Sequence, residues 1–123
     1  PKPWLLEAIA GRVDAGETAH AAAMREAREE AGLTLRSLEH IASYYPSPGS
    51  VTEFFNTYLG LCELPDTTAG GGGLMTEHED IKTHLLSFDA AMDLVSSGET
   101  NVGPLILAML WLQRERPRLR ASA

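Results

Sequence analysis

The stretch from residue 11 to residue 33 constrains this chain more than any other part of it. Residues 12–17 carry two turn signals built on glycine and aspartate, so we expect a loop there. Residues 18–31 are rich in alanine, glutamate, arginine and methionine, which are good helix formers. Gly32 then stands where a helix prefers a left-handed residue. The sequence therefore predicts a loop that leads into a helix ending at Gly32.

The predicted helix carries three glutamates within five residues, Glu26, Glu29 and Glu30. Positions four apart share a helix face, so Glu26 and Glu30 project together and repel each other by a few tenths of a kcal/mol. Arg25 can pair with Glu29, whereas the other two glutamates lack a comparable partner. A hard divalent cation such as Mg²⁺, which takes oxygen ligands, would relieve the repulsion. On charge alone a solvated acidic face stays the more common alternative.

The spacing of these residues separates the two interpretations. Gly11 is followed after five residues by Glu17, and after seven more the chain reads REAREEAGL. This pattern resembles the Nudix box at every fixed position. With residue frequencies of roughly 5–7%, a chance match has a probability on the order of 10⁻⁸ per start site. Ala27 departs mildly, because that position usually takes a bulkier aliphatic residue.

Four motifs outside the box extend the resemblance along nearly the whole chain. They are Pro3-Trp4-Leu5-Leu6-Glu7, Ser47-Pro48-Gly49 followed by Glu53, Glu77-His78-Glu79-Asp80-Ile81, and Asn101 leading to Leu110-Trp111-Leu112. These motifs resemble the ADP-ribose pyrophosphatase branch of the Nudix family. The resemblance implies metal-dependent hydrolysis of ADP-ribose to AMP and ribose 5-phosphate, with Mg²⁺ or Mn²⁺ as cofactor. Alternatives are a GDP-mannose or other nucleotide-sugar pyrophosphatase, or a non-catalytic truncated remnant of the family.

The resemblance assigns roles to residues of the box. Glu26 and Glu30 would be metal ligands, together with the backbone carbonyl of Ala10. Glu29 would be a ligand or would hold a water at the metal. Arg25 would orient the glutamates through charge-assisted hydrogen bonds.

Residues far from the box would complete the site by the same resemblance. Glu77 matches the position of the general base, and Glu79 matches a further metal ligand. A water would attack one phosphorus, a carboxylate would take its proton, and cations would neutralise the developing charge. A solvated acidic loop is the alternative for these two residues. Glu53 resembles a residue that binds the terminal ribose, in a pocket that Ser47 and Gly49 would shape.

The order of predicted elements indicates an α/β (α+β) chain. We expect strands at residues 35–45, 51–64 and 81–86, and helices at 87–96 and 101–117 that begin at Ser87 and Asn101. Residues 4–10 read as a strand or an extended segment, 65–73 as a connection, and 74–80 as an acidic loop. The resemblance implies a Nudix-like α/β/α sandwich with a mixed sheet, in a single domain over residues 1–123 that lacks the family's N-terminal strands.

Composition bounds the partners and the cellular setting. The net charge of −7 argues against wide nucleic-acid surfaces, but a bound cation still allows a small phosphorylated substrate. No stretch approaches the ~20 apolar residues of a membrane-spanning helix. Cys62 is the single cysteine, which excludes an internal disulfide and favours a reducing compartment. We therefore expect a cytoplasmic protein with a small nucleotide substrate.

The short approach to the box predicts an oligomer. Members of the family usually carry two or more core strands before the box, whereas only ten residues precede Gly11 here. A sheet without those strands would expose apolar edges that pair with another copy. We therefore expect either a fragment of a longer chain or an intimate homodimer.

Overall fold

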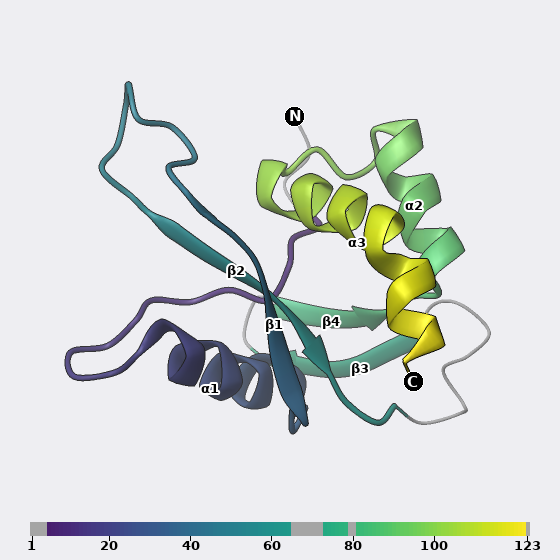
Figure 1. Ribbon diagram of the computed structural model, residues 1–123, viewed down its shortest axis with the longest axis horizontal. Helices are drawn as coiled ribbons and strands as arrows, with labels where there is room; N and C mark the ends of the chain where they lie inside the picture. Colours follow the sequence, from purple (N-terminus) through teal and green to yellow (C-terminus); the bar gives the residue numbers. More distant parts are fainter. Residues whose placement is uncertain (1–4, 65–72, 79–80, 123) are drawn as a thin grey trace.

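The computed structural model describes residues 5–64, 73–78 and 81–122, and for residues 73–78 it describes the backbone alone. One helix is followed by four strands and two further helices. In chain order these are α1 Ala19–Ala31, β1 Ser37–Tyr44, β2 Phe55–Leu61, β3 Gly73–His78, β4 Ile81–Leu85, α2 Phe88–Ser97 and α3 Gly103–Ala121 (Figure 1). The predicted α+β class is confirmed.

The strands form two antiparallel hairpins. β1 pairs with β2 from Ser37 opposite Leu61 to Tyr44 opposite Phe55, with an irregularity after His40. β3 pairs with β4 in a second ladder, which also contains one irregularity. Both ladders are antiparallel in the part of the chain that the structure describes, where a mixed sheet was expected. The observed architecture is therefore two hairpins set between helices.

The helices lie on two sides of these hairpins. α1 contacts β3 and β4, whereas α3 contacts β2 and also packs against α2. Figure 1 shows α1 apart from the other two helices, with the strands between them. This layering brings the predicted box helix against the second hairpin, whose strand β3 includes the distal candidate Glu77.

Local signals predicted the ends of α1 and α2. The Thr18 side chain accepts a hydrogen bond from the Ala21 N–H at 3.0 Å, and Gly32 ends α1 with φ 66°. Ser87 begins α2 in the same way, and Gly98 ends it with φ 79°. A hydroxyl satisfies an orphan N–H at the start of a helix, and glycine adopts the left-handed conformation at its end without a steric penalty.

Three local predictions were wrong. The expected acidic loop at residues 74–80 is largely strand, since β3 runs to His78 and its backbone pairs with β4. α3 does not end at Pro117 but continues to Ala121, and its N-cap is Val102 rather than Asn101. Arg118, just beyond the proline, donates hydrogen bonds to Glu115, three residues earlier on the helix, and to Glu39, a contact across 79 residues that a sequence pattern does not reveal.

The core of the described residues is thin. Ala22, Ala27 and Ala31 on α1 and Met109 on α3 are its buried hydrophobic members, and none of the described residues is a large side chain that is fully buried. Large hydrophobic side chains instead lie exposed: Leu5, Ile9, Val13, Tyr45, Val51, Phe54, Leu64, Ile81, Leu107 and Leu110. No helix within the described ranges is long and apolar enough to cross a membrane.

Candidate active site

Arg25 is the centre of the most highly connected charge cluster in the box. Its Nε and Nη2 donate to the two carboxylate oxygens of Glu17 at 2.9 and 3.0 Å. Its Nη1 donates to Glu26 at 2.8 Å and to Glu29 at 3.0 Å, and its Nη2 also donates to the Arg12 carbonyl at 2.9 Å. The expected contact with Glu29 is present. The planar guanidinium thereby fixes three carboxylates and the loop in one geometry.

Glu17 connects the loop to this cluster. Its carboxylate accepts from the Asp14 N–H at 3.0 Å, and its own N–H donates to the Asp14 carbonyl at 3.0 Å. The hydrogen bonds from Arg25, and next that from Asp14, hold the pKa of Glu17 below its ordinary value. Gly16 takes φ 79° at the turn, a conformation that other residues adopt only with strain. The loop is therefore closed by Glu17 before α1 begins.

Gly11 allows the loop to approach the helix closely. A Cβ atom at this position would overlap the carboxylate of Glu26. The side chain of Glu26 is 14% exposed, so it lies largely enclosed between the loop and Arg25. A residue larger than glycine at position 11 would therefore displace a predicted metal ligand.

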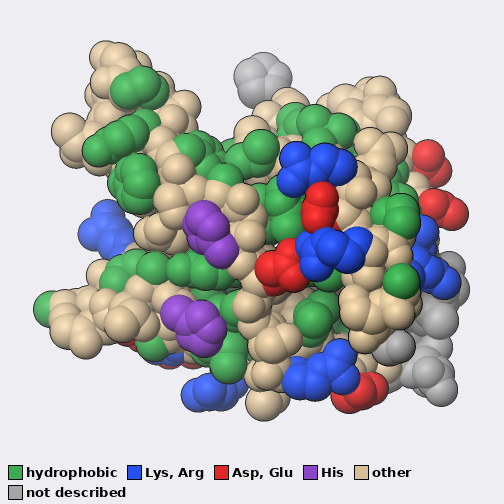
Figure 2. All heavy atoms as spheres, in the orientation of Figure 1, with side chains coloured by type: hydrophobic (Ala, Val, Ile, Leu, Met, Phe, Trp, Pro, Cys, Tyr) green, Lys and Arg blue, Asp and Glu red, His purple; other side chains and the backbone are tan. Residues whose placement is uncertain are grey.

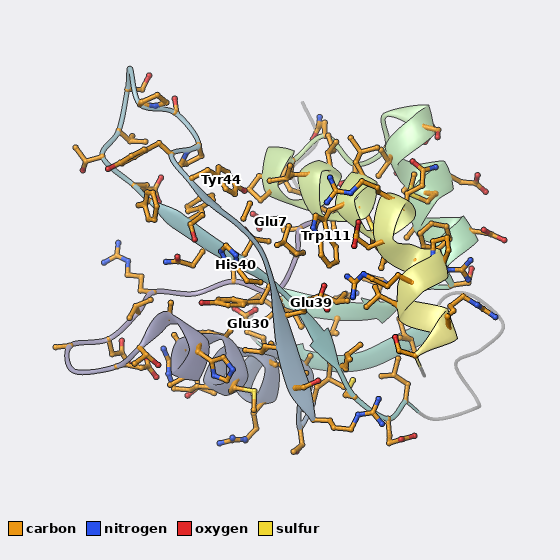
Figure 3. The ribbon with its side chains drawn as sticks, viewed as in Figure 1. Glu7, Glu30, Glu39, His40, Tyr44 and Trp111 are labelled. Carbon is orange, nitrogen blue, oxygen red and sulfur yellow. The ribbon has the colours of Figure 1, made fainter. Side chains whose placement is uncertain are left out.

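Glu30 meets the segment that precedes the loop. The Ala10 N–H donates to Glu30 Oε2 at 3.3 Å, so Ala10, whose carbonyl is the predicted ligand, lies beside Glu30. Burial raises the pKa of Glu30, and the negative charges of Glu26, Glu7 and Glu29 raise it further against the Ala10 hydrogen bond. Figure 3 labels Glu30 on α1 and Glu7 on the preceding segment. The negative charge of Glu30 is thus less favourable than that of a solvated glutamate, and a nearby cation would offset this cost.

The second hairpin is attached to α1 at the same residue. The Thr83 hydroxyl on β4 donates to the Glu30 carbonyl at 2.9 Å. Glu77 lies on β3 opposite Lys82, within the hairpin that contacts α1. The structure describes the backbone of Glu77 but not its side chain, and Glu79 lies outside the described residues. The backbone therefore places Glu77 on the hairpin nearest the box helix.

The predicted ribose-binding residues lie elsewhere. Ser47, Gly49 and Glu53 are exposed in the connection between β1 and β2. The Ser47 carbonyl accepts from the N–H groups of residues 50 and 51, both at 3.0 Å. This connection extends away from α1 as the end of an arm (Figure 1). Within one described chain, these residues are not brought to Glu30.

Comparison with known proteins agrees with the geometry of the box. The family model for the NUDIX domain matches residues 1–106. The chain belongs to the Nudix family. That match includes the loop, α1, both hairpins, α2 and the first turn of α3.

The similar proteins with known names fall into two groups, ADP-ribose pyrophosphatases and GDP-mannose pyrophosphatases. An ADP-ribose pyrophosphatase of Haemophilus influenzae is 37% identical over 121 residues, which are 98% of this chain and 55% of that protein. One from Escherichia coli K12 is 38% identical over 119 residues, or 96% and 56% of the two chains. A GDP-mannose pyrophosphatase of Salmonella paratyphi B is 33% identical over 109 residues, or 89% and 56%. This Nudix chain thus spans a little over half the length of the relatives that it matches.

The donor chemistry of this Nudix site fits a hard divalent cation. Glu26, Glu29 and Glu30 present carboxylate oxygens, which Mg²⁺ and Mn²⁺ prefer. Burial and neighbouring carboxylates raise the pKa of Glu30, a strain that a cation would relieve. Among the side chains that the structure describes, those of residues 5–64 and 81–122, however, no three acidic, histidine or cysteine groups already form a metal-binding group. Completing a ligand set would require Glu26 to turn from Arg25, or a donor from the second hairpin.

Sequence reasoning missed Thr83 and Thr100. Both hydroxyls bond to a backbone carbonyl far away in the chain, Thr83 to Glu30 and Thr100 to Leu6. A lone threonine in a strand carries no signal for such a contact. Thr100 stands beside Asn101, and the sequence predicted Asn101 as the cap of the last helix, because asparagine is a common helix-capping residue.

Proposed function

We propose that this Nudix chain hydrolyses ADP-ribose to AMP and ribose 5-phosphate. The observation that carries the proposal is the Arg25 cluster, which orders Glu17, Glu26 and Glu29 beside the contact between Ala10 and Glu30. Relatives named as ADP-ribose pyrophosphatases are 37–38% identical, whereas those named as GDP-mannose pyrophosphatases are 29–33% identical. This difference favours ADP-ribose over GDP-mannose.

The residues would divide the chemistry among them. Glu26, Glu30, Glu79 and the Ala10 carbonyl would hold Mg²⁺, or Mn²⁺ in its place, with Arg25 and Glu29 fixing their orientation. The cation supplies positive charge against the diphosphate when bound. A water oxygen bonds to one phosphorus while the bridging P–O bond of that phosphorus breaks.

Glu77 would take the proton of the attacking water. A carboxylate can act as a general base when it lies within hydrogen-bond reach of the attacking water. The second hairpin carries Glu77 and bonds to Glu30 through Thr83, which supports a shared site. The leaving phosphate keeps the bridging oxygen, so atoms and charge balance.

Turnover of defined substrates tests the proposal. The chain is incubated with Mg²⁺ and either ADP-ribose, GDP-mannose or a deoxynucleoside triphosphate, and the products are separated by ion-exchange chromatography. We expect AMP from ADP-ribose at the highest kcat/KM. A higher kcat/KM with GDP-mannose would establish the second candidate instead. Absence of any product would identify a non-catalytic member of the family.

We also propose that the active form is a homodimer. Tyr45, Val51 and Phe54 expose 59%, 41% and 49% of their surface on the arm between β1 and β2. Figure 2 shows hydrophobic side chains gathered on this arm. Exposed apolar patches of this kind mark interaction sites. A second copy could then receive the arm, and with it Ser47, Gly49 and Glu53, at its own Glu30.

Light scattering coupled to size-exclusion chromatography tests the dimer. We expect a mass of twice 13.3 kDa at micromolar concentration. A monomer at that concentration would contradict the proposal.

We also propose that the protein lies in the cytoplasm, because a single cysteine, Cys62, suits a reducing compartment.

A further inference from the structure

Thr100 is a buried polar residue in the connection between α2 and α3. It is 2% exposed, and it is the one buried polar or charged residue among those that the structure describes. Its hydroxyl donates to the Leu6 carbonyl at 3.0 Å, across 94 residues of sequence. Its N–H donates to the Leu94 carbonyl of α2 at 3.1 Å. Thr100 is thus fixed to α2 through its backbone and to the N-terminal segment through its side chain.

The segment held by Thr100 leads directly to the predicted metal site. Leu6 precedes Ala10 by four residues, and the Ala10 N–H donates to Glu30 Oε2. Residues 5–14 belong to no helix or strand in the described structure, so no ladder fixes their path. The path between Leu6 and Ala10 is therefore defined at its two ends, by Thr100 and by Glu30.

Small displacements of this segment matter for a metal site. A short stretch with fixed ends has few conformations, and freeing one end multiplies them. Mg²⁺ demands near-ideal octahedral geometry, so a displaced backbone donor binds it poorly. Contacts behind the ligands commonly tune metal affinity for this reason.

We propose that Thr100 is a positioning residue for the metal site of this chain. Its hydroxyl holds the Leu6 carbonyl and thereby delivers the backbone of Ala10 to Glu30. Thr100 itself touches neither the substrate nor the reacting atoms. The inference rests on the proposed function in one respect, since it takes the backbone of Ala10 to be part of the metal site.

A graded series at position 100 tests the inference by direct metal binding. Mn²⁺ is titrated into the whole chain, and free Mn²⁺ is measured by electron paramagnetic resonance. Thr100→Val keeps the side-chain shape but removes the donor, and we expect its Kd for Mn²⁺ to rise about tenfold. Thr100→Ser keeps the hydroxyl, and we expect a Kd within about twofold of the parent chain. Thr34→Val makes the same change at an exposed threonine and should leave Kd unchanged.

A second variant keeps the test decisive when Thr100→Val does not fold. Thr100→Cys retains a weak donor, so its Kd should fall between those of the serine and valine variants. Circular dichroism and thermal unfolding confirm which variants are folded. A folded Thr100→Val or Thr100→Cys chain that binds Mn²⁺ like the parent would overturn the inference. A folded Thr100→Ser chain that binds Mn²⁺ as weakly as Thr100→Val would overturn the inference as well.

Turnover separates this inference from the proposed function. If the parent chain binds Mn²⁺ but does not cleave ADP-ribose, the proposed substrate is wrong and the ordering of metal affinities still decides the role of Thr100. If the parent cleaves ADP-ribose, the Thr100→Val variant should have a lower kcat than the parent at limiting Mg²⁺. Its kcat should return to that of the parent at saturating Mg²⁺, and its KM for ADP-ribose should be unchanged. A loss of kcat that Mg²⁺ does not restore would contradict positioning through the metal site. A parent chain without Mn²⁺ binding would overturn the inference outright.

Discussion

The box and the arm between β1 and β2 carry two halves of the proposed site, and they are built differently. In the box, the side chains of Glu26, Glu17 and Arg25 are 14%, 17% and 26% exposed, and both glutamates accept hydrogen bonds from Arg25. On the arm, Tyr45 and Phe54 are 59% and 49% exposed and contact each other edge to face at 4.8 Å between ring centres. The side chains of the box are therefore ordered around Arg25 within one chain, although they do not yet form a complete metal-binding group, whereas the proposed ribose half depends on what the arm meets.

This difference follows from the distances in sequence that each half must span. The box residues that meet around Arg25 come from one continuous loop and helix, so few conformations must be excluded to bring them together. The arm instead presents its side chains outward at the end of a hairpin. Changes in the box should therefore alter metal binding and kcat, and changes in the arm should alter KM.

Removing the charge of Glu30 is expected to have the largest effect. Glu30→Gln takes away a metal ligand, and we expect kcat/KM for ADP-ribose to fall by at least about a hundredfold. Glu63→Gln is the matched control, because its side chain is 93% exposed and pairs only with Arg36 among the contacts found in the described structure. Equal activity of the two variants would show that the metal half has been misassigned.

The same variant should be more stable without metal. Burial raises the pKa of Glu30, so its ionised form destabilises the folded chain fully above that raised pKa. The penalty shrinks as the pH falls through the raised pKa and is gone below the ordinary value of 4.5. At neutral pH without metal, Glu30→Gln should therefore raise Tm by a few degrees and lose the further stabilisation that Mg²⁺ gives the parent.

Replacing Arg25 by lysine should have the second largest effect. Lysine keeps the charge, but its single ammonium group cannot reproduce the two-oxygen contact with Glu17 together with the bonds to Glu26 and Glu29, so the ligands lose their common orientation. We expect kcat to fall up to about a hundredfold, as a displacement of the ligands by an ångström allows. Arg28→Lys, an exposed change on the same helix, should be silent. Equal kcat values for the Arg25→Lys and Arg28→Lys variants would show that the Arg25 cluster does not order the metal ligands.

The elements that the sequence predicted correctly depend on local chemistry. Thr18, Gly32, Ser87 and Gly98 lie at the ends of α1 and α2 because capping involves neighbours within one turn. β3 was missed because its stabilisation comes from pairing with β4. A ladder of this kind depends on a partner segment, whereas the residues themselves carry turn-forming glycines and charges.

In the site too, contacts between near neighbours in sequence were predicted, whereas contacts between distant residues were missed. The contact between Arg25 and Glu29 was predicted from their spacing, and the structure contains it. The bonds from Thr83 to Glu30 and from Thr100 to Leu6 were missed, since they join residues 53 and 94 positions apart. Ser47 was assigned to the ribose by resemblance alone, and no contact in the described chain tests it.

Changes on the arm should affect substrate binding more than turnover. Glu53→Gln and Ser47→Ala remove groups proposed to bond to the terminal ribose, and we expect KM for ADP-ribose to rise about tenfold with kcat nearly constant. Ser50→Ala alters an exposed residue of the same turn and serves as the control. Initial rates over a range of ADP-ribose concentrations measure both constants. A fall in kcat without a change in KM would show that the arm acts on the chemical step.

The smallest effect is the pH dependence that Glu17 gives the loop. Arg25 lowers the pKa of Glu17, so this carboxylate stabilises the fold fully above its ordinary value of 4.5 and loses the effect as the pH falls through the lowered value. Tm measured from pH 6 to pH 3 should decline less steeply for Glu17→Gln than for the parent chain. Glu115, whose pKa is lowered by hydrogen bonds from Arg118 and then Arg114, provides a matched control on α3.

These two variants sharpen the role of the box cluster. Both Glu17→Gln and Glu115→Gln remove a carboxylate that arginine stabilises, so both should flatten the decline of Tm in acid. Glu17 also shares Arg25 with Glu26, and therefore its variant alone should weaken Mn²⁺ binding at neutral pH. Identical Mn²⁺ affinities would mean that the Arg25 cluster stabilises the loop without orienting the metal ligands.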